Sequence, residues 1–213
     1  MSQLKNEVSS SDFEVEADDH YAASKLALIR LVNTLRVGLT VLALVIGVVV
    51  LGLGADTLAV YRATSLPEDY LLQLWPAEFD IRPTNALIAC GVIVLVANGM
   101  ALGLSQVSAI HTKYAARSSV SLAAPVIGLI GALVAMSIFY AINASTEVDS
   151  IQSWSCRWEG VAMSMQPHFG TLCKESKAAL TLATLLVPVE ALIIGVAGYE
   201  AALLRRISQA SHH

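Results

Sequence analysis

Four long stretches of the chain are almost free of charge, and this feature constrains the fold more than any other. Residues 37–55, 83–110 and 118–146 contain no Asp, Glu, Lys or Arg, and residues 178–204 contain only two glutamates. A helix of about 20 apolar residues crosses the roughly 30 Å hydrocarbon layer of a bilayer. The chain is also 55% hydrophobic and only 14% charged, which is unusual for a soluble domain. The sequence therefore predicts an all-α fold, a four-helix transmembrane bundle.

The predicted spans cover about 37–58, 84–108, 120–143 and 178–203. Residues 1–20 are acidic and serine-containing without apolar periodicity, and we predict a disordered cytoplasmic tail there. The bundle is expected over 21–206, with a short cytoplasmic tail at 207–213. Apolar residues recur at helical spacing before the first span: Leu28, Leu31, Val32 and Leu35. That segment is either an amphipathic helix at the lipid headgroups or an extension of the first span.

Lysine and arginine are divided unevenly between the two sides of the predicted bundle. The side with both termini and the middle loop carries eight, whereas the side with the first and third loops carries five, together with nine acids. Cytoplasmic segments of membrane proteins are enriched in these cations. We therefore predict that both termini are cytoplasmic, in the plasma membrane or another membrane of the secretory pathway. The formal net charge of −4 is then split between two compartments and indicates no partner.

The three cysteines fit this orientation. Cys90 lies within the second span and is expected to behave as a small hydrophobic residue. Cys156 and Cys173 both lie in the third loop, on the predicted exoplasmic side, where the environment is oxidising. This placement predicts a disulfide that staples the loop, with two free thiols as the alternative.

Every span carries small residues at helical spacing. Such residues let membrane helices approach closely, which favours a compact bundle; the alternative is that one surplus stripe faces another protein, since the second span has two. The stripes are Thr40, Ala43, Gly47 and Gly54; Gly91, Asn98, Ala101 and Ser105, with Gly99 and Gly103 on a second face; Ser121, Ala124, Gly128, Gly131 and Ala135; and Thr184, Pro188, Ala191, Gly195, Gly198 and Ala202.

Glu190 lies near the middle of the fourth span, where a carboxylate is costly unless it is paired, protonated or hydrated. No cation lies deep in another span, so we expect a hydrogen bond instead, with Asn98, with a hydroxyl such as Ser137, or with the carbonyl freed by Pro188. The site is either a protonated acid inside the bundle or a protonatable group in a transport path. Glu200 is expected to pair with Arg205 and Arg206.

The third loop, 147–177, has the most distinctive chemistry. It clusters aromatic and polar residues that form either a partner-binding surface or a disulfide-stapled cap on the helix ends; these residues are Trp154, Arg157, Trp158, His168 and Phe169. The first loop adds aromatic residues expected at the membrane interface: Tyr61, Tyr70, Trp75 and Phe79. Asn143 begins an Asn-Ala-Ser glycosylation sequon at the end of the third span, close to the membrane.

Motifs for chemistry are missing from the sequence. There is no nucleotide-binding glycine loop, no His-Glu-x-x-His and no Gly-x-Ser-x-Gly. His168 would need further ligands to hold a metal, and His111 is predicted on the other side of the membrane. We therefore predict no enzymatic activity, no cofactor, no metal and no nucleic-acid partner.

Three segments carry a resemblance to known proteins: Trp-Ser-Cys-Arg-Trp at 154–158, Pro-His-Phe-Gly-Thr-Leu-Cys at 167–173, and Leu-Trp-Pro-Ala-Glu-Phe-Asp-Ile-Arg-Pro-Thr at 74–84. With these segments the chain resembles a group of uncharacterised fungal four-span integral membrane proteins. Its layout is similar to that of tetraspan proteins of the MARVEL, claudin-like and tetraspanin groups. The cysteine pair lies in the last loop, whereas that of claudins lies in the first. The last loop also lacks the Cys-Cys-Gly run of tetraspanins. The resemblance implies a topology but no activity.

Two functional hypotheses follow. The first is a non-enzymatic tetraspan protein that organises or accompanies other membrane proteins, or copies of itself, in the lipid bilayer. The second is a small transporter or channel component that uses Glu190, with Asn98, as an intramembrane polar site.

Overall fold

The computed structural model of the chain describes residues 3–65, 74–76, 79–106, 114–144, 148–161 and 163–210. In residues 3–26, 105–106, 114–121, 204, 206–208 and 210 it describes the backbone alone. Within these ranges, four helices are long and apolar enough to cross a membrane, at Ala27–Thr64, Arg82–Leu104, Leu122–Asn143 and Phe169–Leu203. The predicted all-α bundle of four transmembrane helices is confirmed.

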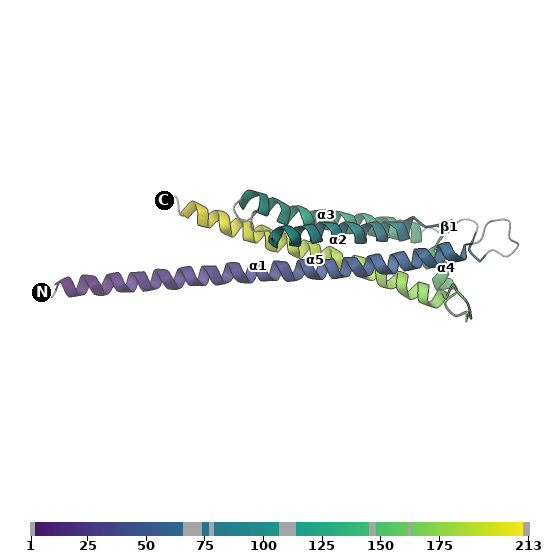
Figure 1. Ribbon diagram of the computed structural model, residues 1–213, viewed down its shortest axis with the longest axis horizontal. Coiled ribbons are helices and arrows are strands. Elements are labelled where there is room, and N and C mark those ends of the chain that lie inside the picture. Colours follow the sequence, from purple (N-terminus) through teal and green to yellow (C-terminus); the bar gives the residue numbers. More distant parts are fainter. Residues whose placement is uncertain are drawn as a thin grey trace.

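The element order is four long helices with a short helix and two short strands between them (Figure 1). The elements are α1 (Gln3–Thr64), β1 (Phe79–Asp80), α2 (Arg82–Gln106), α3 (Tyr114–Asn143), β2 (Asp149–Ser150), α4 (Ile151–Arg157) and α5 (Phe169–Ala210). The strands pair in parallel, with Phe79 opposite Asp149, and tie the segment before α2 to the segment before α4. No sequence pattern predicted this pairing.

The four long helices form a closed ring in which α1 and α3 lie opposite each other. Helix α1 packs against α2 and α5, and α3 packs against the same two helices. Helix α1 begins and α5 ends at the same end of the bundle, which we call the terminal end; α4 and the strands lie at the other end, the loop end (Figure 1).

Helix α1 is longer than predicted at both ends. It begins at Gln3, within the segment 1–20 for which a disordered tail is predicted. No Pro or Gly precedes Gly38, and extending an existing helix is far easier than nucleating one, so α1 propagates back from the span. The segment that contains Leu28–Leu35 is therefore an extension of the first span and not a separate helix. At its other end, α1 continues past the predicted boundary to Thr64.

Helix α5 begins at Phe169, nine residues before the predicted span, so Cys173 lies inside a helix and not in a loop. The carbonyl of His168 accepts hydrogen bonds from the backbone N–H groups of Thr171 and Leu172 at 3.0 and 3.2 Å, which closes the first turn. The loop was predicted to extend to Lys177 because charged residues were taken to mark the membrane boundary. A helix does not have to end there, since its backbone groups are satisfied internally in water as well.

Where their side chains are described, the stripes of α1 and α3 and the first stripe of α2 lie toward the inside of the bundle. Helices α1 and α2 approach closely at Gly47 and Gly91. A Cβ atom added at Gly91 would lie 2.9 Å from the backbone nitrogen of Leu51 and 3.0 Å from the carbonyl oxygen of Gly47. Around this crossing the core consists of Ala43, Ile46 and Val50 of α1, Leu87, Cys90 and Val94 of α2, Ala132, Ala135 and Phe139 of α3, and Ala179, Ala183, Leu186 and Ile193 of α5.

Candidate functional site

Two candidate sites emerge from the fold: a polar pair in the middle of the bundle and a stapled cap at its loop end. At the first, the side chains of Glu190 on α5 and Asn98 on α2 are fully buried. The Asn98 Nδ2 group donates a hydrogen bond to Glu190 Oε1 at 2.9 Å and a second one to the Val94 carbonyl at 3.1 Å. Among the partners considered from the sequence, the structure therefore places Asn98 beside the glutamate.

The other two proposed partners lie elsewhere. The Ser137 hydroxyl is exposed on α3 and donates to the carbonyl of Leu133 on its own helix, 2.7 Å away. The carbonyl freed by Pro188 belongs to Thr184, four residues earlier on α5. The hydrogen bond that the structure gives to Glu190 comes from Asn98 on α2.

Gly128 of α3 makes room for this pair. A Cβ atom added at Gly128 would collide with the carboxyl group of Glu190, lying 2.8 Å from its Cδ atom. Glycine at this position leaves the space that the carboxyl group occupies, and a larger residue would displace that group. Two oxygens in the site, Asn98 Oδ1 and Glu190 Oε2, are buried and have no hydrogen-bond partner among the described residues. The arrangement is thus a buried polar site with spare hydrogen-bonding capacity.

The small-residue stripe of α5 points away from the bundle, unlike the stripes of α1 and α3 and the first stripe of α2. Pro188, Ala191 and Gly195 are exposed, and a Cβ atom added at Gly195 or Gly198 would meet no described atom within 4 Å. At about 100° per residue, Pro188 and Gly195 lie about 160° and 140° around the helix from Glu190. Turning the carboxyl group into the bundle therefore turns this stripe outward.

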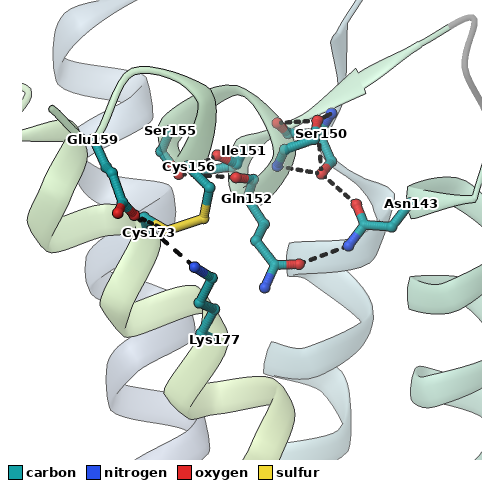
Figure 2. The surroundings of a disulfide bond; sticks show 10 residues. Asn143, Ser150, Ile151, Gln152, Ser155, Cys156, Glu159, Cys173 and Lys177 are labelled. Atoms are coloured by element: carbon teal, nitrogen blue, oxygen red, sulfur yellow. Dashed lines mark hydrogen bonds and ion pairs between the residues drawn. A yellow bond between two sulfur atoms is a disulfide. The ribbon is translucent and has the colours of Figure 1, made fainter.

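The second candidate site is the cap, held by the predicted disulfide between Cys156 and Cys173, whose Cα atoms are 4.8 Å apart. The bridge joins the last turn of α4 to the first turns of α5 (Figure 2). The Glu159 carboxylate lies 3.1 Å from the Cys173 sulfur and 3.9 Å from the Lys177 ammonium group. Sulfurs bonded to each other are not thiolate ligands, so this cluster is not a metal centre in its oxidised form.

Helix α4 is short but well capped, which fixes the position of Cys156. The Ser150 hydroxyl accepts from the Ser153 backbone N–H while the Ser153 hydroxyl accepts from the Ser150 N–H, a reciprocal capping box. Asn143, the last residue of α3, also contacts the N-terminus of α4 (Figure 2). Its amide donates to Gln152 at 2.6 Å and accepts from the Ser150 hydroxyl at 2.7 Å. Both polar atoms of the sequon asparagine are therefore engaged in holding α4.

An aromatic cluster fills the space beneath the cap. The rings of Tyr61, Trp75 and Phe79 pack within 4.9–5.3 Å of one another, and Phe169 packs edge-on against Trp75 at 5.6 Å. The indole N–H of Trp75 donates to the Thr64 hydroxyl at 3.1 Å. Tyr61, Trp75 and Phe79, which were expected at the membrane interface, thus form one core with Phe169 that joins α1 to α5. Tyr70 lies outside the described residues.

The residues predicted for a partner-binding loop divide into buried and exposed sets. Phe169 is 5% exposed and belongs to the cap core, so it is not available to a partner. Trp154 is partly buried beneath Arg157, whose guanidinium lies 5.7 Å from the indole ring and forms an ion pair with Asp149 at 3.0 Å. Trp158 is 42% exposed and His168 is exposed. The two exposed residues are continued by Val161 and Met165 on the same loop, a feature that the sequence analysis missed.

Two further contacts were not predicted. Glu200 pairs with Arg36 of α1 at 3.4 Å, a bridge that ties α1 to α5. The expected partner Arg205 is exposed, and the side chain of Arg206 lies outside the described residues. At the loop end, the carboxyl groups of Asp56 on α1 and Glu175 on α5 lie close enough to interact. Each contact joins residues far apart in sequence, and no local pattern pointed to them.

Comparison of the chain with protein-family models, with curated proteins and with solved structures returns no match.

Proposed function

We propose that the chain is a non-enzymatic four-span membrane protein that organises or accompanies other membrane proteins. In this proposal both termini face the cytoplasm and the cap faces the exoplasmic side of the plasma membrane or another secretory-pathway membrane. The observation that carries the proposal is the outward stripe of α5, formed by Pro188, Ala191, Gly195, Gly198 and Ala202.

Small residues stabilise little where a membrane helix faces lipid, because lipid chains pack equally well against larger side chains such as leucine. They matter where another helix approaches, since a flat helix surface allows close van der Waals contact between backbones. In α1, α2 and α3 the stripes that face inward are used inside the bundle, as at Gly47, Gly91 and Gly128, whereas Gly103 on the second stripe of α2 is exposed. The α5 stripe has no such use within the described chain, which supports a role in contacting a helix of another protein or of a further copy.

The cap supports the same proposal from outside the membrane. The disulfide and the aromatic cluster hold the loop of Trp158, Val161 and Met165 in place, and the exposed fractions of these side chains are 42%, 49% and 78%. A rigid scaffold that presents apolar side chains is typical of a protein-binding surface. A partner could then contact both the α5 stripe in the membrane and this loop beside it.

The experiment is crosslinking in native membranes, followed by isolation in mild detergent and identification of proteins recovered in fixed ratio. Gly195→Leu would fill the stripe and should reduce recovery of the partner at least several-fold. Val134→Leu, an exposed position on α3, is the matched control and should leave recovery unchanged. If the wild-type chain is recovered alone, or both variants behave alike, the proposal is wrong.

A second candidate function is a small transporter or channel component, favoured by the buried Asn98–Glu190 pair with its two unpartnered oxygens. Intramembrane ionisable residues often mark proton or ion paths. Under this alternative, Glu190→Gln abolishes flux through reconstituted vesicles while the protein remains folded. Under the organising role, the same variant leaves partner recovery unchanged, so the two proposals are separable.

A further inference from the structure

Among the residues whose side chains the structure describes, no positive charge lies beside the carboxyl group of Glu190. Helix α1 carries no Asp, Glu, Lys or Arg over 37–55, α2 none after Arg82, and the described side chains of α3 none. On α5 itself the nearest charges are Lys177 and Glu200, about 20 and 15 Å away along the helix axis. The titratable group that faces it from α2 is the thiol of Cys90, which is buried and free. An ionised carboxylate here would be buried without a counter-ion, which is strongly unfavourable.

If Glu190 is ionised, the Asn98–Glu190 pair has one donor hydrogen too few for its acceptor oxygens. The two N–H groups of Asn98 are both used, one on Glu190 and one on Val94. What remains is Asn98 Oδ1 and Glu190 Oε2, both buried and both acceptors if the carboxyl group is ionised. Two neighbouring acceptors cannot satisfy each other. A single proton on Glu190 Oε2 converts it to a donor, and the amide oxygen is the acceptor left over.

We infer that the Asn98–Glu190 pair is a proton-binding site in which the neutral acid and the amide form a cyclic pair with two hydrogen bonds. One of the two hydrogen bonds is already present, because the Asn98 Nδ2 group donates to Glu190 Oε1 at 2.9 Å. The O–H bond from Oε2 to Asn98 Oδ1 completes the ring and satisfies both remaining oxygens. Gly128 leaves the space in which the carboxyl group lies, so α3 shapes the site without contributing a polar side chain.

The number of oxygens that remain available in the site favours a proton over a metal cation. Hard cations such as Mg²⁺ and Ca²⁺ take about six to eight oxygen ligands, and the described part of the site offers two spare oxygens. A proton needs one donor atom and one acceptor atom, which matches that number. The inference concerns occupancy of the site and holds whether or not the protein carries out transport or organises partners.

The test is infrared spectroscopy of the full chain in lipid bilayers at pH 7, as a difference between wild type and Glu190→Gln. The expected result is a carbonyl band of a neutral carboxylic acid that the variant lacks. Asn98→Leu should shift this band, because the acid loses the amide oxygen that accepts its hydrogen bond. Glu200→Gln is the matched control: its carboxylate pairs with Arg36, so the acid band should be unchanged while carboxylate intensity falls.

Carboxylate bands in place of the acid band in the Glu190→Gln difference would overturn the inference, as would an acid band that Asn98→Leu leaves unmoved. Should Glu190→Gln fail to fold, Gly128→Ala replaces it. The added methyl group displaces the carboxyl group from Asn98 while both polar side chains remain. It must then shift the acid band, and an unchanged spectrum would count against the site.

Discussion

Replacing Gly91 with alanine tests whether the crossing of α1 and α2 is set by close backbone contact. The added Cβ atom would lie 2.9 Å from both the Leu51 nitrogen and the Leu51 Cβ, and 3.0 Å from the Gly47 carbonyl oxygen. Two of these three atoms are backbone, so no rotamer change relieves the contact and the helices must move apart. Gly103 lies on the same helix, and a Cβ atom added there would meet no described atom within 4 Å, so it serves as the matched control.

Two effects of opposite sign act on stability when a helical glycine is replaced by alanine. Overpacking in a well-packed core costs about 1–3 kcal/mol, whereas glycine to alanine in a helix gains up to about 1 kcal/mol in water. Gly91→Ala should therefore lose about 0–2 kcal/mol net, and Gly103→Ala should be neutral or stabilised by up to about 1 kcal/mol, so Gly91→Ala should be the less stable variant by about 1–3 kcal/mol. Denaturant unfolding of each variant in the same detergent or bilayer measures the difference. If Gly91→Ala is as stable as Gly103→Ala, the backbone contact does not set the crossing.

Three further outcomes are expected. Replacing Cys156 and Cys173 together with alanine should lower the free energy of unfolding by about 3 kcal/mol. In thermal unfolding, a reductant should destabilise the wild type by a similar amount and leave the double variant unchanged. Phe169→Ala should cost about 3–5 kcal/mol by emptying the cap core, whereas Trp158→Ala should stay within about 1 kcal/mol; equal losses would contradict the division into buried and exposed residues. Asn143→Ala should lose about 1–3 kcal/mol, because Gln152 and Ser150 lose their partner, and endoglycosidase treatment of the wild type should leave its gel mobility unchanged.

The positions of the spans were predictable because membrane helices are specified locally. A charge-free run long enough to cross hydrocarbon has few other stable structures, since its backbone must satisfy its own hydrogen bonds. The disulfide was predictable for a similar reason, because Cys156 and Cys173 lie in one segment and on one side. The ends of α1 and α5 were not, because charge marks the membrane boundary whereas the helix continues through it to Thr64 and back to Phe169.

Side-chain partners depended on how the helices rotate and pack. The sequence offered Asn98, Ser137 and the carbonyl freed by Pro188 as candidates and paired Asn98 with Glu190 as an intramembrane polar site, but only the packing of the bundle placed the amide 2.9 Å from the carboxyl group. The pairing of Glu200 with Arg36 likewise spans most of the chain.

By itself, the sequence determined four membrane-crossing helices, a stapled loop and one carboxyl group that had to be accommodated in the middle of a span. Tertiary structure alone decided which face of each helix turns inward. That choice brings Asn98 and Gly128 to Glu190 and leaves Gly195 exposed on the outer surface. The physical reason is that composition and spacing set the cost of exposing a group to lipid, whereas its partner is set by helix rotation and packing across the whole bundle.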